Sequence, residues 1–470
     1  MRREITSALT CAMLVAVCSC AVGPNYHRPP FQTTAAFKEQ GDWKPSEPDD
    51  ALSRGPWWHI FDDPVLDGLE QQIDISNQTL KAAADAYRQA QALVTQARAG
   101  LWPTIAASGS RQREQQSLGP PYGVVRETSN FLSASGTWQI DIWGQTRRTV
   151  ESNEASAQAS AAAVAAARLS AQSGLATTYF ELRAQDSLQK LLDDTVVDEQ
   201  KTLDITKNRY SYGVAAKADV VTAQTQLLSS QAQQINAAIA RAQFEHAIAV
   251  LIGQQPAAFS LPVTPLRTDV PTTPAGLPSA LLERRPDVAQ AERKMAAANA
   301  QIGVAVAAYF PNLTLSGSAG YENVGFLRQL VESKNSIWAV GPTLAETLFD
   351  GGLRRAQTAQ ARAAYDASVD NYRQTVLTSL QQVEDNLVVL RVLEHQASIE
   401  DEAVMAAREA ERLTLNQYKA GTVPYTSVIT AQTTTLASEQ TALTVLLDRL
   451  SASVALVQAI GGGWSTAPVH

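Results

Sequence analysis

Strict alternation of apolar and polar residues marks two regions of this chain. Around residues 104–142 one run of apolar positions alternates with Ser, Thr, Gln and Asp: Leu132, Ala134, Gly136, Trp138, Ile140 and Ile142. A weaker strand precedes it from Thr104. Around residues 312–348 the apolar positions Leu313, Leu315, Gly317, Ala319 and Tyr321 follow the same rule, and a second strand lies near Ser336 to Leu348. Because successive side chains of a strand point to opposite faces, both regions are predicted β-hairpins with one apolar face.

A period of seven governs the long segments between these hairpins. In the first half the repeating positions are Leu175, Leu182, Gln189, Val196, Leu203 and Tyr210, then Val221, Leu228, Ile235, Ala242 and Ala249. In the second half they are Val376, Val383, Leu390, Ala397 and Val404, then Ile429, Leu436, Leu443, Leu450 and Val457. Sustained sevens predict long helices packed as a coiled coil. A shorter helix is expected before each hairpin, over 64–101 and from about Ser279 to Pro311.

The chain also repeats its own motifs at one spacing. The sequence NRYSYG at 208–213 returns as NQYKAG at 416–421, and 416 − 208 = 208. Pro103 returns as Pro311, again 208 residues later. Two landmarks at one offset indicate a duplicated unit far longer than a solenoid repeat. We therefore divide the chain into a first repeat at 64–253, a connector at 254–278, a second repeat at 279–461 and a tail at 462–470.

The N-terminus is typical of an export signal. Arg2 and Arg3 precede a mostly apolar stretch, and Val17-Cys18-Ser19-Cys20 resembles the bacterial lipobox. The prediction is a signal peptide at 1–19 and a lipid-anchored segment at 20–63, with diacylglycerol and an N-acyl chain on Cys20 and no other cofactor. An ordinary signal peptide that contains Cys is the alternative. All three cysteines lie at this end, so the mature chain has no internal disulfide.

Charge and composition exclude several classes of function. The formal net charge is −8, and removing Arg2, Arg3 and Glu4 with the signal peptide gives −8 − 1 = −9, which disfavours nucleic acid. No later stretch holds about eighteen consecutive apolar residues, so we expect no transmembrane helix. The five histidines lack metal-ligand spacing and no catalytic motif is present, so the chain is not expected to be an enzyme.

Four amphipathic strands are too few to cross a membrane alone. Strands in lipid must close into a barrel, which needs at least about eight of them. Three chains would supply 3 × 4 = 12 strands; soluble hairpins are the alternative. A helix of about 65 residues would extend nearly 100 Å at about 1.5 Å per residue, long enough to form the wall of a tube.

Several long motifs, in order along the chain, resemble one known family. They are CAVGPNY at 20–26, ERRPDV at 283–288, NAQIG at 299–303, AAYFPNL at 307–313 and FDGG at 349–352. Together they resemble the NodT/OprM-type outer membrane factor lipoproteins of the TolC family. The resemblance implies an α+β membrane protein: a homotrimeric outer-membrane β-barrel, four strands per chain, continued by a periplasmic α-helical coiled-coil barrel. It also implies a passive efflux duct in the outer membrane of a Gram-negative bacterium, with two partners: a periplasmic adaptor and an inner-membrane pump of the resistance-nodulation-division type.

The resemblance places the two repeated turns, near 208–216 and 416–424, at the periplasmic tip. Adaptor contact is then expected at Arg209, Tyr210, Gly213, Tyr418 and Gly421.

The same resemblance places the periplasmic gate just after the second turn. In relatives an apolar residue lies five positions past the Gly and a carboxylate four positions later. Here these positions are Thr426 and Thr430, and the nearest acidic candidate is Asp219 in the first half. A carboxylate ring would attract cations, whereas threonine rings are neutral.

Two other functions stay open at this point. A type I secretion duct is disfavoured by the lipobox and the Arg-Arg-Pro-Asp signature. A lipid-anchored structural coiled coil without a pore would not need amphipathic hairpins. The exported compound is left open among drugs, organic solvents, phenolics and metal ions.

Overall fold

The structure is a computed structural model that describes residues 21–29, 37–40, 56–121, 123–271 and 285–462. The predicted signal peptide, Cys20 and nearly all of the predicted tail lie outside these residues. The chain divides into two compact units. Unit 1 is Met1–Pro30, Ala86–Ala161 and Gln290–Arg373, and unit 2 is Phe31–Asp85, Ala162–Ala289 and Gln374–His470.

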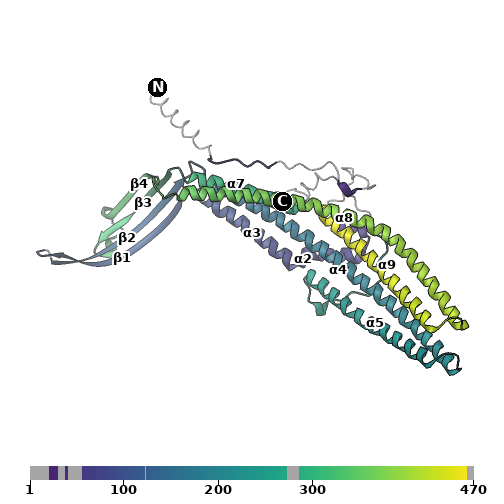
Figure 1. Ribbon diagram of the computed structural model, residues 1–470. Coiled ribbons are helices and arrows are strands. Elements are labelled where there is room, and N and C mark those ends of the chain that lie inside the picture. Colours follow the sequence, from purple (N-terminus) through teal and green to yellow (C-terminus); the bar gives the residue numbers. More distant parts are fainter. Residues whose placement is uncertain (1–20, 30–36, 41–55, 122, 272–284, 463–470) are drawn as a thin grey trace. The chain divides into compact units, whose positions relative to one another are not determined.

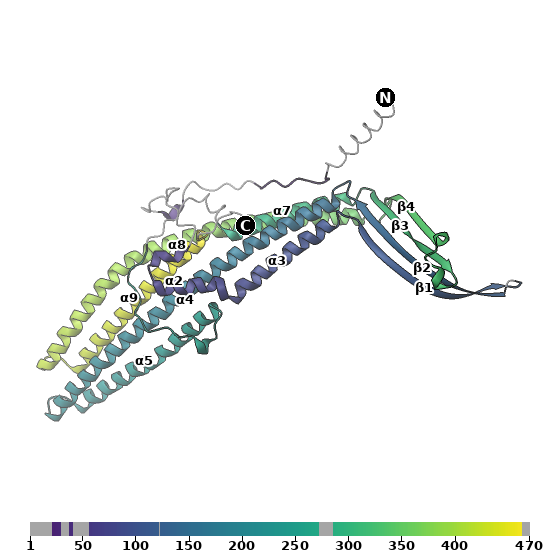
Figure 2. The same ribbon diagram turned by 180° about the vertical axis from the view of Figure 1, so that it is seen from behind.

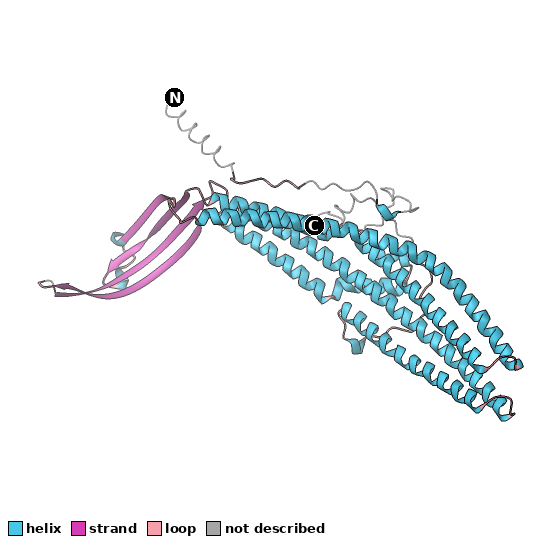
Figure 3. Cartoon of the chain, viewed as in Figure 1, coloured by secondary structure: helices cyan, strands magenta, loops and turns pink. Residues whose placement is uncertain are grey.

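Unit 1 contains a four-stranded antiparallel sheet in the order β1-β2-β3-β4 (Figure 3). Its strands are β1 (Thr104–Gly119), β2 (Gly123–Ile140), β3 (Asn312–Val324) and β4 (Ser336–Ala345). Both predicted hairpins are confirmed. The pairing of β2 with β3, which joins the hairpins into one sheet, was not predicted; it places Ala134 opposite Ala319 and Trp138 opposite Leu315.

The register aligns the apolar positions of all four strands on one face. Trp138 pairs with Leu315, which pairs in turn with Pro342, and Ala107 pairs with Ala134. Several large side chains of this face are exposed, for example Ile105 at 78% and Trp338 at 77%, while Trp138 and Leu315 are half-buried. The opposite face carries hydroxyl groups, with Ser108 Oγ 3.2 Å from Ser133 Oγ. A soluble sheet normally covers its apolar face, so this exposed face requires an apolar neighbour.

Small residues bring helices of unit 1 close together. Here the start of α4 (Gln145–Ser211) lies against α7 (Pro286–Ala307). Ala155, Ala296 and Ala297 form a small apolar cluster, and the Ser152 hydroxyl donates to the Ala297 carbonyl at 3.1 Å. The structure begins α7 at Pro286; the predicted start near Ser279 lies outside the described residues.

Unit 2 is a layer of long helices. Residues of α8 (Leu353–Ala420), α9 (Tyr425–Ala459), α4 and α5 (Lys217–Leu251) lie side by side in that order, as two opposite views show (Figures 1 and 2). The predicted long helices are thus confirmed: α4 has 67 residues and α8 has 68.

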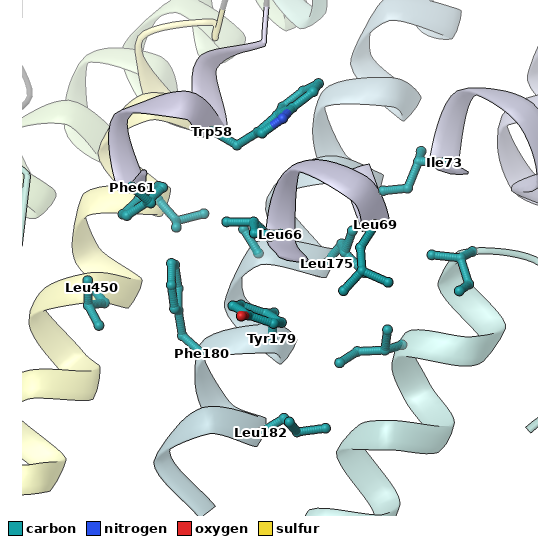
Figure 4. Packing of buried hydrophobic residues seen from close by; sticks show 14 of the residues in the cluster. Trp58, Phe61, Leu66, Leu69, Ile73, Leu175, Tyr179, Phe180, Leu182 and Leu450 are labelled. Atoms are coloured by element: carbon teal, nitrogen blue, oxygen red, sulfur yellow. The ribbon is translucent and has the colours of Figure 1, made fainter. Parts of the chain in front are cut away.

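The main core of unit 2 forms where α2 (Pro64–Ser76) packs on this layer (Figure 4). Leu66 and Ile73 of α2 are fully buried against Leu175 and Leu182 of α4. Asp63 caps α2 by accepting from the amides of Val65 and Leu66, as the sequence pattern of a helix start suggests. This core fixes the α4 heptad positions inside the chain.

The predicted single helix over 64–101 is wrong, because α2 ends at Ser76 and α3 (Gln78–Ala99) begins two residues later. Asn77 separates them in extended conformation. Its Oδ1 accepts from the Leu80 amide at 2.9 Å, and its Nδ2 donates to the Leu251 carbonyl at 2.7 Å. A side chain that caps one helix and binds the end of another favours a break that helical periodicity does not reveal.

One helix in the described part of the chain, α9, is long and apolar enough to cross a membrane, with a mean hydropathy of 1.4 over eighteen residues. The expectation of no such helix rested on runs of consecutive apolar residues, and Thr and Ser interrupt those runs in α9. Leu450 and Val454 of α9 are buried in the main core. A buried core helix of a helical bundle has the same length and hydropathy, so this one helix is weak evidence for a membrane span.

Candidate functional site

Two sharp turns connect the long helices of unit 2. The first turn, residues 212–216, joins α4 to α5, and the second turn, residues 421–424, joins α8 to α9. Both turns lie at the predicted positions, and both carry the duplicated motif.

The two turns have the same backbone hydrogen bonds. In the first, the amide of Val214 donates to the Arg209 carbonyl and that of Gly213 to the Tyr210 carbonyl, both at 2.9 Å. In the second, Thr422 donates to Gln417 at 3.0 Å and Gly421 to Tyr418 at 2.9 Å. These are Schellman motifs, which need a residue at positive φ, and the two glycines have φ of 73° and 81°. The motif glycines are therefore required by the turn itself.

The residues after each turn differ for a chemical reason. Asp219 Oδ2 accepts from the Ala216 amide at 3.3 Å and so caps α5. Position 216 corresponds to Pro424 in the second half, since 216 + 208 = 424, and Pro has no amide hydrogen to offer. A carboxylate at the matching Ser427 would have no such donor. Asp219, predicted as an acidic gate candidate, thus has a capping role, and its place in a pore is untested.

The repeated tyrosines lie in different surroundings. Tyr210 is 46% exposed, whereas Tyr418 is 3% exposed. The Tyr418 ring lies 5.4 Å from that of Tyr425, and its hydroxyl is 3.4 Å from Thr206 Oγ1. Burial raises the pKa of the Tyr425 hydroxyl, and the negative charge of Glu199 adds to the rise. Of the tyrosines predicted for adaptor contact, only Tyr210 has an accessible ring in this chain.

Arg209 connects the first turn to the second. Its Nη1 donates to the Lys419 carbonyl at 2.8 Å, in the last turn of α8. Its guanidinium carbon lies 4.8 Å from the centre of the Tyr418 ring. A cation at a helix C-terminus and over an aromatic face is favourable on both counts. The matching residue in the second half is Gln417, so the second turn has no equivalent arginine to bind the first.

An apolar cluster lies beneath both turns and holds them together. Its buried members come from all four long helices: Leu203, Ala223, Leu227, Tyr418, Tyr425 and Val428. The two turns therefore form one packed end of unit 2.

Thr426 and Thr430, the predicted gate residues, are exposed on α9. The Thr430 hydroxyl donates to the Thr426 carbonyl at 3.0 Å, and Thr433 bonds the carbonyl of Ile429 in the same way at 2.9 Å. Since the hydroxyl protons of Thr430 and Thr433 are used within the helix, these two side chains offer methyl groups and weak acceptors without charge. The neutral gate expected at Thr426 and Thr430 stays a prediction.

Sequence reasoning missed Tyr425, which shares the buried position with Tyr418. A signal was present: an aromatic residue, Tyr425, opens the helix after the second turn, whereas Lys217 takes that place in the first half.

Comparison with known proteins identifies the family. The model of the outer membrane efflux protein family matches residues 69–254 and again 277–462. The two matches begin 277 − 69 = 208 residues apart, which is the offset of the repeated motifs.

Curated relatives span nearly the whole chain. The probable efflux pump outer membrane protein TtgC of Pseudomonas putida is 28% identical, with 99% of this chain and 96% of the relative covered. The pyoverdine export outer membrane protein OpmQ of Pseudomonas aeruginosa is 30% identical, with 99% and 98% covered. Among solved structures, the outer-membrane channel OprN is similar with a TM-score of 0.86 and 29% identity, over 95% of this chain and 100% of that one. The chain therefore belongs to the outer membrane efflux protein family.

Proposed function

We propose that this protein is the outer-membrane channel of a tripartite efflux pump, a passive duct that receives substrates from a periplasmic adaptor and an inner-membrane pump. The observation that carries the proposal is the apolar face that runs in register across all four strands, exposed in a chain of an efflux family. An apolar face with hydroxyl groups on the opposite face suits a sheet that has lipid on one side and water on the other. The duct itself has no chemical step.

A homotrimer would complete the barrel, since three chains supply 3 × 4 = 12 strands. The helices support the same assembly. The α5 heptad residues Val221, Leu228 and Ile235 are 53%, 55% and 72% exposed, and on α8 Val392 and Ile399 are 55% and 54% exposed. These helices are the two outer members of the layer in unit 2 (Figure 1).

Two different unpartnered edges fit a head-to-tail contact, α5 of one chain against α8 of the next, which closes a ring. Ile235→Glu is then expected to dissociate the trimer on native mass spectrometry. Gln233→Glu, on the opposite side of α5, is the control, and a trimer unaffected by both would contradict this interface.

We further propose that the two turns form the periplasmic end, where Arg209, Tyr210, Gly213, Tyr418 and Gly421 meet or position the adaptor. Thr426 and Thr430 would then line the gate. Replacing Thr430 with Asp would add a ring of carboxylates and should increase cation selectivity in planar bilayers. Unchanged reversal potentials would reject a pore-lining position.

Lipid attachment at Cys20 completes the proposal. The residues just after it are held against the end of β2: the Val22 amide donates to the Trp143 carbonyl at 3.0 Å, and Arg148 Nε donates to the Val22 carbonyl at 3.1 Å. A segment bound beside the end of a sheet proposed to face lipid suits a chain that is anchored in lipid just before that segment in the sequence. Mass spectrometry of the mature protein tests this: Cys20→Ser should lose the acyl mass, and an unmodified wild-type Cys20 would refute it.

Conductance of the purified protein in planar bilayers tests the central claim. We expect discrete channels whose closed state predominates without partners. A stable, correctly folded trimer that never conducts, under voltage or after weakening of the turns, would favour a structural coiled coil instead.

A further inference from the structure

A groove in unit 2 lies between α4, α8 and α9 and encloses about 390 Å³. Five carboxylates line it: Asp194, Asp198, Glu199, Glu411 and Glu439. The cations of the lining are Arg408 and Arg412. The lining therefore carries an excess of negative charge.

The ion pairs of the described residues leave part of this charge unmatched. Arg408 binds Glu439 at 2.6 Å, and Arg412 pairs at 2.6 Å with Glu409, which is not part of the lining. Surface lysines pair with Asp194 and Asp198, at 3.0 and 2.8 Å. No ion pair in the described part of the chain includes Glu199 or Glu411.

Two buried acceptors in the same lining have no donor. Glu199 is 3% exposed; its Oε1 accepts from Gln226 Nε2 at 3.0 Å, while Oε2 has no partner. Gln432 is 7% exposed and its Oε1 also has no partner. Buried polar atoms are normally hydrogen-bonded, so a pair of orphans in one groove is unusual.

The orientation of the Gln432 amide follows from its neighbours. Its Nε2 donates to Thr202 Oγ1 at 3.3 Å, and the Thr202 hydroxyl donates to the Asp198 carbonyl at 2.9 Å. Because the Thr202 proton is already used, Thr202 can only accept, and turning the amide round would place two acceptors together. The unpartnered atom that Gln432 adds to the lining is therefore an acceptor.

Such a lining selects the chemistry of its ligand. Acceptors and net negative charge require a cation that carries several N–H donors. A metal ion fits poorly, because no group of three His, Cys, Asp or Glu side chains in the described residues is placed to hold one. Burial raises the pKa of Glu411, and the negative charges of Glu439 and Asp198 add to the rise. Hydrogen bonds from Thr435 and Gln432 oppose it. A raised pKa is expected for a carboxyl that lacks its counter-ion.

We propose that this groove binds a guanidinium or primary ammonium group, held by Glu199, Glu411 and the Gln432 carbonyl oxygen. The group could come from a free small amine or from an arginine side chain of a partner protein. Since α4 belongs to the first half of the chain and α8 and α9 to the second, the ligand would tie the two halves together and stabilise the folded state.

The test is calorimetric titration of the purified full-length protein with three probes: agmatine, N-acetylargininamide and its uncharged analogue N-acetylcitrullinamide. We expect saturable binding of at least one cation and none of the citrulline compound. Preference for agmatine would identify a free amine, and preference for the capped arginine would identify a protein side chain. Glu199→Gln should weaken binding at least about tenfold, because it removes a charge-assisted hydrogen bond.

Asp204→Asn is the matched control, since Asp204 lies on the same helix outside the lining and pairs with Gln200. Its affinity should equal that of the wild type. If Glu199→Gln disturbs folding, Glu411→Gln at a half-buried position carries the same expectation. Absence of saturable binding by both cations, or equal affinity in wild type, Glu199→Gln and Glu411→Gln, would overturn the proposal. The titration is independent of conductance, so its failure is distinct from failure of the channel function.

Discussion

Replacing Arg209 with Gln tests whether the link between the two turns keeps them closed. The change gives the first turn the residue that the second turn has at the matching position, Gln417. It removes the hydrogen bond to the Lys419 carbonyl and the contact with the Tyr418 ring. The Schellman bonds of the first turn use only the backbone of Arg209, so they should survive.

The magnitude follows from those two contacts. A charged hydrogen bond contributes about 1.5–3 kcal/mol and a cation–π contact at a partly exposed site about 0.5–1 kcal/mol. Because Arg209 is half-buried, solvent screens part of both, and we take about 2 kcal/mol. That corresponds to roughly a thirtyfold rise in the population of the opened turn.

Hydrogen exchange measures that population directly at the amides of the second turn. We expect exchange at Gly421 and Thr422 to accelerate by roughly thirtyfold in Arg209→Gln, because local opening controls exchange there. Arg373→Gln is the control; Arg373 makes only a long, exposed ion pair with Asp370 at 3.6 Å. Exchange rates equal in wild type and Arg209→Gln would show that the apolar cluster alone holds the turns.

Three further predictions concern other contacts. Gly421→Ala should lower the free energy of unfolding by about 1–2 kcal/mol, because φ is 81°, whereas Gly68→Ala, at an open helical position, should not lower it; chemical denaturation compares them. Burial raises the pKa of Glu70 to about 9, with Asp74 and Asp67 adding to it. A carboxyl whose pKa is raised in the folded state stabilises the fold at low pH. The free energy of unfolding should therefore fall as pH rises from about 4.5 towards 9, by at most about 1.4 kcal/mol per pH unit. Glu70→Gln should flatten the dependence of the urea midpoint on pH between about pH 5 and 8, and an unchanged slope would refute this. Arg148→Ala should release residues 21–29, since Arg148 also binds Asn25 at 2.9 Å; faster proteolysis there than in Arg98→Ala is the expected result, and equal rates would contradict the clamp.

The sequence predicts much of this fold because its two periods differ so clearly. Alternation over many residues leaves no alternative to strands, and sustained sevens leave none to long helices. Features set by single side chains were not predictable. Asn77 breaks a helix whose apolar pattern continues, because its side-chain amide donates to the carbonyl of Leu251, which is 174 positions away in the sequence. The pairing of β2 with β3 likewise depends on the return of the chain after about 170 residues.

The two turns were located more accurately than the chemistry around them. The duplicated motif identified both turns, since Gly at positive φ is a backbone requirement visible in sequence. The capping role of Asp219 was not predicted, because its partner is a backbone amide three residues before it; Pro424 lacks that amide at the matching place before Ser427.

The two halves share their order of helices and turns but differ in which heptad residues are buried. Heptad residues of α9, such as Leu436 and Leu450, are buried within the chain, while the matching Leu228 of α5 is exposed. The tilted rings of Tyr418 and Tyr425 are buried together at the second turn, whereas Tyr210 and Lys217 are exposed at the first. The matching last helices of the two repeats therefore take different places, α9 inside the layer and α5 at its edge. An edge that keeps coiled-coil spacing without an internal partner is what a chain needs to form a closed ring with copies of itself.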